Sequence, residues 1–281
     1  MKTVKFGALL TMGLAFAFFI AGCGDNGPTS PDEQEIQDLI EGSYSAYFSF
    51  GSAFACDDEL LKDDSAPYFD SLYNWRYTDR DVDRSISIDI DGDTADVEIE
   101  YTFSATAVFK GWVAGTLATY DRPVEFSGTR YATFVREDSL WRLAEISLVN
   151  IKTDESMSLI DSVVITDYST GEDYTVSLPG TLIPVDELFT FNSGDSIGVE
   201  VFTSEDCFAQ YRHPNFASYR RDRMDEDSPR RHRYHTIVHS LEGVKRFVID
   251  VVTQDSGLDM NGPQVGEIWI ILAHATEEET F

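Results

Sequence analysis

From Ser85 onward, the apolar residues recur at every second position, which is the period of a β-strand with one buried face. The run 86–90 alternates Ile with Ser and Asp, and the run 97–103 alternates in the same way after Asp91-Gly92. Two alternating runs joined by Asp-Gly predict a β-hairpin. Two further strands are expected, at 124–136 and 140–151. This part of the chain should therefore form an antiparallel meander.

The residues before the meander have the period of a helix. Ser30 can cap the first turn, Pro31 suits the first helical position, and Glu33 completes a capping box. The apolar residues that follow at spacings of three and four are Ile36, Leu39, Ile40, Tyr44, Tyr47 and Phe48. A helix is expected over 31–50, and residues 52–84, which are acidic and aromatic, should form short helices under a sheet. A helical start followed by a meander predicts an α+β fold.

A second set of short strands is expected after residue 156. The candidates are 158–167, 173–178, 188–191, 196–203, 207–212, 233–240, 246–253 and 267–274. In the run 196–203, Ile197, Val199 and Val201 share one face, while Glu200 points away. Turn residues such as Pro179-Gly180 separate the strands, which predicts an antiparallel β-sandwich over 157–281, immunoglobulin-like in broad form. Residues 247–252 and 268–272 are nearly continuous apolar runs, as expected for strands that are covered on both faces.

The N-terminus has the form of a secretory signal. Lys2 and Lys5 precede an apolar run over 6–20, which is too short to be a comfortable membrane span. The run ends in Ile20-Ala21-Gly22-Cys23.

This ending resembles the lipobox of bacterial lipoproteins. The resemblance implies a signal peptide at 1–22, diacylglycerol on the Cys23 thiol and a fatty acid such as palmitate on the new amine. Two or more acyl chains anchor a protein stably to a membrane, and residues 23–30 would be the tether. Gly24 after the cysteine favours the outer membrane by the same resemblance, with the protein facing the periplasm or the cell surface. An ordinary cleaved signal with an incidental cysteine is the alternative.

Residues 31–152 resemble the NTF2-like (SnoaL-like) superfamily. The likeness is carried by the opening helix, the run Ile88–Ile99 and Leu140-Trp141-Arg142-Leu143 at the start of a strand. It implies a cone of helices and a curved antiparallel sheet, followed here by the sandwich. Members of that family include enzymes, ligand-binding proteins and assembly modules, so the fold alone does not assign a function.

Net charge and missing motifs narrow the function. Fifty Asp and Glu face 21 Lys and Arg, a net charge of −29 at pH 7, which repels phosphate and makes nucleic acid an unlikely partner. The sequence contains no phosphate-binding loop, nucleophile elbow or metalloprotease motif, so no catalytic, cofactor-binding or metal residues are assigned. Residues 31–152 contain no histidine, and Tyr101 and Tyr131 are expected to be core residues rather than parts of an active site.

Two possible metal sites are rejected on spacing. Asp89, Asp91, Asp93 and Glu100 match ligand positions of an EF-hand loop, but Thr94 occupies the position that needs glycine, and both flanks alternate as strands. His235 and His239 are four residues apart, which on a strand is about 13 Å and too far for one ion.

The segment 212–233 is rich in arginine and interrupted by acids. It is either a long loop that docks on an acidic partner or a solvated, self-paired insertion. The candidate docking residues are Arg220, Arg221, Arg223, Arg230, Arg231 and Arg233.

Cys56 and Cys207 are the remaining thiols once Cys23 is acylated. Outside the cytoplasm they could form a disulfide between the two predicted domains, 31–152 and 157–281, or remain two separate free cysteines. Their acidic neighbours would raise the thiol pKa, which argues against a reactive nucleophile.

Taken together, the sequence favours a lipid-anchored protein of the bacterial cell envelope that acts as a non-enzymatic binding or assembly module. Its partner would be an envelope protein or a small molecule. The alternatives are an NTF2-like enzyme acting on a small apolar substrate in the cone, and carbohydrate or metal binding by the sandwich.

Overall fold

The computed structural model describes residues 30–49, 70–153, 156–215, 218–228, 230–238, 242–259 and 261–276, with the side chains of 213–221 excepted. The predicted signal peptide at 1–22, Cys23 and Cys56 lie outside these residues. So do His239 and the side chains of Arg220 and Arg221.

Two short helices open the described chain, where one long helix was predicted. Helix α1 (Pro31–Glu41) begins as the capping box indicates, and the Glu33 amide donates to Ser30 Oγ at 3.2 Å. It ends at Gly42, whose amide donates to the Asp38 carbonyl oxygen, and α2 (Ser45–Phe48) follows after a turn. The predicted start is confirmed, and the predicted end is wrong because Gly42 closes the helix early.

Three long strands follow: β1 (Ser71–Asp91), β2 (Thr94–Val113) and β3 (Thr116–Glu137). β1 and β2 form the predicted hairpin, with Ile86 opposite Ile99 and Gly92 in the left-handed conformation (φ 62°) that the turn requires. The short helices expected over 52–84 are wrong for residues 71–84, which belong to β1, and residues 52–69 lie outside the described part of the chain. Bulges after Leu72 and after Thr78 interrupt its alternation, which hid the strand in the sequence.

The remaining elements are mostly strands. They are β4 (Leu140–Ile146), β5 (Val149–Lys152), β6 (Ile160–Asp167), β7 (Glu172–Thr175), β8 (Ile183–Pro184), β9 (Phe189–Asn192), β10 (Ser196–Thr203), β11 (Cys207–Asn215), β12 (Ser218–Arg223), β13 (Asp225–Ser228), β14 (Arg231–Ile237), β15 (Gly243–Thr253) and β16 (Gly266–Thr276), with helix α3 (Gln254–Leu258) between the last two and one turn of 3-10 helix, Val185–Glu187. Each strand predicted between 158 and 274 is present. β12 and β13 lie in the arginine-rich segment that was expected to be a loop.

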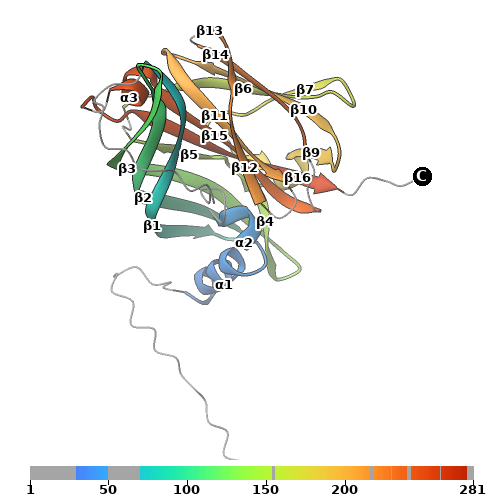
Figure 1. Ribbon diagram of the computed structural model, residues 1–281. Helices are drawn as coiled ribbons and strands as arrows, with labels where there is room; N and C mark the ends of the chain where they lie inside the picture. Colours follow the sequence, from blue (N-terminus) through green and yellow to red (C-terminus); the bar gives the residue numbers. More distant parts are fainter. Residues whose placement is uncertain are drawn as a thin grey trace, which may run out of the picture.

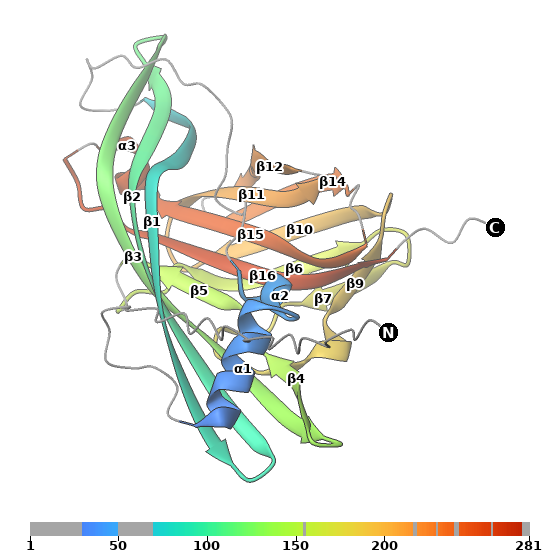
Figure 2. The ribbon, with the colours of Figure 1, turned by 90° about the horizontal axis from the view of Figure 1, so that it is seen from below.

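Two sheets contain all sixteen of the described strands, and every pair is antiparallel except β9 with β16. Strands β4, β8 and β9 lie beside the main path of the larger sheet. The larger has the order β1-β2-β3-β5-β16-β15-β11-β12, and the smaller has the order β13-β14-β10-β6-β7. The smaller sheet packs on β16, β15 and β11, which gives a sandwich (Figures 1 and 2). The long β1–β3 strands extend beyond this sandwich, with α1 and α2 beside them (Figure 2).

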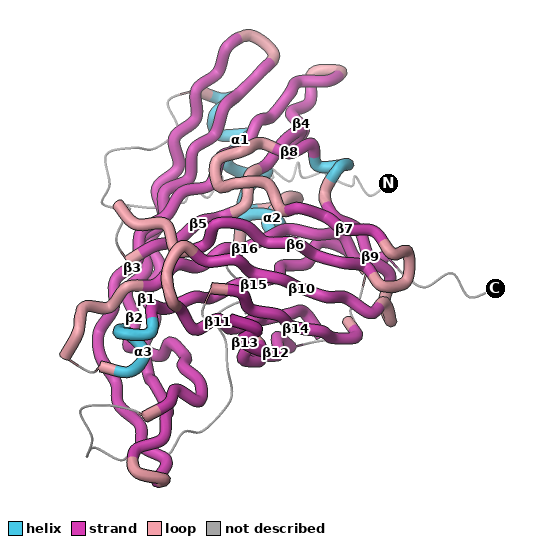
Figure 3. Tube along the Cα trace, turned by 90° about the horizontal axis from the view of Figure 1, so that it is seen from above, coloured by secondary structure: helices cyan, strands magenta, loops and turns pink. Residues whose placement is uncertain are grey.

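The α+β fold with an NTF2-like cone is therefore wrong. Strands dominate the described residues, and the helices among them are short (Figure 3). The sheet begun by β1, β2 and β3 does not close around helices. It continues through β5 into β16, at the far end of the chain. The coarser prediction of an antiparallel β-sandwich in the second half agrees with the fold.

The larger sheet runs across the predicted domain boundary at 150–160. Ile151 on β5 pairs with Gly128 on β3 and with Ile268 on β16. A Cβ at Gly128 would lie 2.2 Å from the Asn150 carbonyl oxygen, so glycine is what allows β3 to approach β5 here. Residues 31–152 and 157–281 consequently share a sheet.

Both faces of β15 and β16 are buried, as their apolar runs predicted. Ile268, Ile270 and Leu272 join a core with the β1–β3 strands and helix residues Ile36 and Ile40. The alternate residues of β16 and β15, including Trp269 and Phe247, belong to a second core against the five-stranded sheet. The central strands thus separate two hydrophobic layers.

Candidate functional site

The outer face of the five-stranded sheet carries the candidate site. β10 lies at its centre, between β14 and β6. Ile197, Val199 and Val201 are buried in the sandwich core, as their alternation predicted, so Gly198 and Glu200 face outward. Gly198 lies opposite His235 on β14, and Glu200 lies opposite Arg233.

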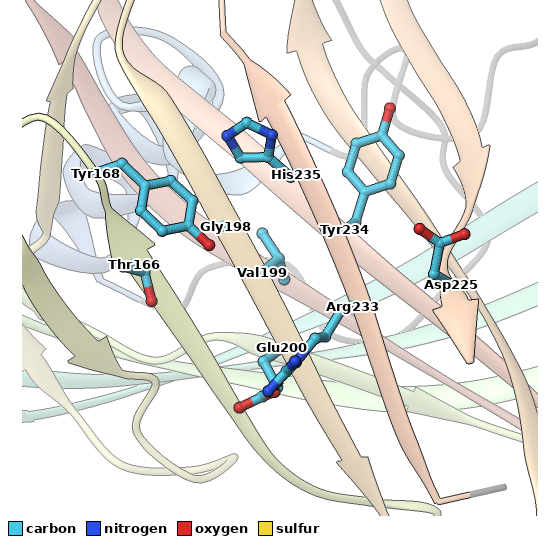
Figure 4. A pocket seen from close by; sticks show the side chains of 9 residues that line it. All are labelled: Thr166, Tyr168, Gly198, Val199, Glu200, Asp225, Arg233, Tyr234 and His235. Atoms are coloured by element: carbon cyan, nitrogen blue, oxygen red, sulfur yellow. Dashed lines mark hydrogen bonds and ion pairs between the residues drawn. The ribbon is translucent and has the colours of Figure 1, made fainter. Parts of the chain in front are cut away.

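A groove of about 350 Å³ runs over this face. Figure 4 shows its side chains, which come from β6, β10, β13 and β14 and from Tyr168 just after β6. The residues used below are Thr166, Tyr168, Gly198, Glu200, Arg233 and His235.

Tyr168 forms the aromatic side of the groove. A Cβ built on Gly198 would lie 2.6 Å from the Tyr168 hydroxyl oxygen and 3.0 Å from two ring carbons, so the ring rests on the bare backbone of β10. The ring of His235 meets it edge to face, with ring centroids 5.0 Å apart. Tyr168 is nevertheless 57% exposed. A large aromatic ring is therefore held in place while much of its surface faces solvent.

Glu200 forms the polar side of the groove together with two arginines. Its Oε1 accepts hydrogen bonds from Arg231 Nε at 2.7 Å and from Arg233 Nε. Arg233 Nη1 also lies 2.8 Å from Asp227 Oδ2. Partial burial opposes ionisation of Glu200, but the hydrogen bonds from both arginines outweigh it and lower the pKa of the carboxyl. The groove thus holds an ionised carboxylate that is paired with Arg233 in the groove and with Arg231 beside it.

Ser196 and His235 form a pair beside the groove that resembles half of a catalytic triad. The Ser196 Oγ lies 2.6 Å from His235 Nε2. A serine nucleophile also needs a group that orients the imidazole and donors for an oxyanion. Among the described residues, no carboxylate hydrogen-bonds His235, and the ring is open to solvent. The pair fits a contact that orients His235 beside Tyr168.

The described arginines of the predicted docking loop pair within the molecule. Arg230 contacts Asp206 at 3.1 Å, and Arg231 and Arg233 share Glu200. Arg223 donates to the Leu72 carbonyl oxygen and lies over the Phe208 ring. These contacts fit the self-paired interpretation of the segment, and docking of an acidic partner stays a prediction.

Other charged groups are buried away from the groove. Arg212 and Asp250 are paired at 2.5 Å between β11 and β15, and Tyr77 donates to the same carboxylate at 3.1 Å. Arg130 donates to the Tyr47 carbonyl oxygen, and its Nε and Nη2 have no hydrogen-bond partner among the described residues. Burial, together with the nearby charge of Arg246, lowers the pKa of Arg130 to about 10, although Tyr101 opposes this shift.

Cys207 is buried and forms no disulfide with another described residue. Burial raises its pKa to about 12, with contributions from Glu205 and Asp206, so the thiol is not a nucleophile at neutral pH. The bond to Cys56 stays a prediction, because Cys56 lies outside the described residues.

Apart from His235, the described candidate residues for metal or active-site chemistry lie outside the groove. No group of His, Cys, Asp and Glu in the described part of the chain is arranged to hold a metal ion. Tyr101 is buried and donates to the Phe48 carbonyl oxygen, whereas Tyr131 is partly exposed in a second groove of about 430 Å³ beside Asp96 and Glu98. The prediction of a core residue is confirmed for Tyr101 and wrong for Tyr131.

The Tyr168 groove was missed in the sequence because its parts come from separate strands. The alternation of β10 correctly turned Glu200 outward, but only the pairing of β10 with β6 and β14 brings Tyr168 and Arg233 to it. Nothing in the sequence around Gly198 indicated that an aromatic ring packs on it.

Comparisons with protein-family models, with curated proteins and with solved structures give no match to this chain.

No helix in the described ranges combines the length and the apolar character needed to cross a membrane.

Proposed function

We propose that this chain is a lipid-anchored protein of the bacterial cell envelope that binds a ligand in the groove of β6, β10 and β14, without catalysing a reaction. The anchor is supported by the lipobox-like Ile20-Ala21-Gly22-Cys23. The binding function is supported by one observation above all: the exposed Tyr168 ring is fixed on Gly198 beside Glu200 and Arg233. Rigid aromatic rings beside charged groups are the usual anchors of binding sites.

The fixed geometry favours binding over catalysis. Glu200 is ionised and shared by two arginines, so it has no proton to donate near neutral pH, and the arginines stabilise its charge instead of raising its basicity. His235 lacks an orienting carboxylate among the described residues. These groups can still donate and accept hydrogen bonds, which is what ligand recognition requires.

The anchor is tested by changing Cys23. The Cys23→Ser protein should leave the detergent phase and the membrane fraction, because it has no thiol to acylate. A membrane fraction unchanged by the substitution, with no lipid on residue 23, would contradict the anchor.

The binding function is tested on protein purified from its own envelope. Denaturing the native protein should release a ligand detectable by mass spectrometry, and Tyr168→Ala should release much less of it. Tyr73→Ala is the matched control, because Tyr73 is 53% exposed and lies outside the groove. Equal release from the Tyr168→Ala protein and the native protein would reject the groove as the binding site.

A further inference from the structure

The aromatic side of the groove presents a flat apolar surface. The Tyr168 ring lies across β10 because Gly198 has no side chain, and the His235 ring makes a T-shaped contact with it (Figure 4). The tyrosine nevertheless stays 57% exposed. A ligand that covers such a ring must itself have a flat apolar face. The C–H face of a pyranose ring has this shape, as does an aromatic group.

The polar side of the groove favours a sugar ring over an aromatic group as the ligand. All hydrogen bonds and ion pairs that Glu200 receives from the described arginines go to Oε1, which leaves Oε2 as an acceptor. Arg233 uses Nε toward Glu200 and Nη1 toward Asp227, which leaves Nη2 as a donor. An acceptor and a donor on neighbouring strands match vicinal hydroxyl groups, because each hydroxyl both donates and accepts. A plain aromatic ligand would leave both atoms without partners.

The charge of the site and of the molecule selects a neutral ligand. The net charge of −29 repels anions, so an acidic ligand is disfavoured before it reaches the groove. Arg231 and Arg233 already neutralise Glu200, so that carboxylate gives a cationic ligand little gain. Asp225 also lines the groove, but it is solvent-exposed, and an exposed carboxylate binds a cation only weakly.

We infer that the groove binds a neutral saccharide, with one sugar ring on Tyr168 and vicinal hydroxyls at Glu200 Oε2 and Arg233 Nη2. This inference rests on the proposed function, since it names the ligand class of the same site. Thr166 lies on the neighbouring strand and extends the polar floor, which suits an oligosaccharide that follows the groove past its first ring.

The inference is tested by calorimetric titration of the mature, acylated protein with a panel of neutral oligosaccharides of glucose, galactose and mannose and with matched uronic-acid oligosaccharides. A neutral member should bind, and its uronic-acid counterpart should bind more weakly. Tyr168→Ala should weaken binding by about tenfold or more. Gly198→Ala should also weaken it while keeping every polar group, because the new Cβ displaces the ring. Tyr73→Ala should leave affinity unchanged.

The outcomes separate this inference from the proposed function. If no saccharide binds, but the native protein releases a different ligand that Tyr168→Ala does not retain, the saccharide is wrong and the binding groove stands. If a saccharide binds equally to the native and Tyr168→Ala proteins, the groove is not its site. If neither saccharide nor released ligand depends on Tyr168, both proposals fail.

Discussion

His232 is a histidine kept neutral by its position. It is buried on β14, and desolvation, with the nearby charge of Arg223, lowers its pKa from 6.5 to about 4. Between these pH values the unfolded chain binds a proton at this residue and the folded chain does not. The stabilisation that comes from keeping His232 neutral should therefore be complete above about pH 6.5. The free energy of unfolding should fall as the pH drops from there toward about 4.

His232→Gln should remove that part of the pH dependence. Comparing urea unfolding at pH 7 and pH 4.5, the native protein should lose about 2–3 kcal/mol more than the variant, because Gln does not titrate. A constant difference between the two proteins across this range would show that His232 has the same pKa in the folded and the unfolded chain.

Asp250 holds a buried ion pair that the groove does not use. Asp250→Asn should lower the free energy of unfolding by about 3–5 kcal/mol, because it leaves the Arg212 guanidinium buried without its carboxylate. Tyr77→Phe is the matched control and removes only one hydrogen bond to the same carboxylate, worth about 1 kcal/mol. Equal losses in the two variants would mean that the charge of Arg212 is stabilised by other groups.

At the level of the elements, local sequence patterns predicted individual strands better than they predicted which strands pair. The alternation of β10 and the double burial of β15 and β16 followed from single runs of residues. By contrast, β1 begins earlier than predicted because bulges break its period, and β5 joins β3 to β16 through contacts distant in sequence. The NTF2-like cone was wrong for this reason: the sequence predicted most of the strands, but it did not show which strands lie next to one another. The groove was missed for the same reason.

The junction of β3 and β5 depends on one glycine. Gly128→Ala places a Cβ against the backbone of Asn150, and a backbone atom cannot move aside as a side-chain end can. We expect a loss of at least about 2 kcal/mol in chemical unfolding, at the upper end of ordinary substitutions. Gly171→Ala is the control, because its Cβ would meet nothing within 4 Å, although its positive φ adds some strain. A loss at 128 no larger than at 171 would mean that β3 and β5 are not this close.

At the scale of the whole molecule, the shared sheet makes the two halves dependent on each other. Ile268, Ile270 and Leu272 pack against the β1–β3 strands, so residues 157–281 alone would expose them. We expect the mature protein to unfold in a single calorimetric transition and each half alone to be less stable than the whole. Two separate transitions, matched by the isolated halves, would restore the division into independent domains.

The groove and the β1–β3 strands belong to different sheets, so the position of the binding site can be tested. The groove lies on the outer face of the five-stranded sheet, whereas β1–β3 belong to the other sheet (Figures 1 and 4). A ligand bound at Tyr168 should therefore slow amide exchange locally, because local opening is suppressed where a ligand is held.

The most direct measurement is hydrogen–deuterium exchange of the mature protein with and without the ligand released from its native form. We expect slower exchange in β6, β10 and β14, no change in β1–β3, and loss of the effect in Tyr168→Ala but not in Tyr73→Ala. Protection confined to β1–β3, or protection of β10 that survives Tyr168→Ala, would contradict a binding site in this groove.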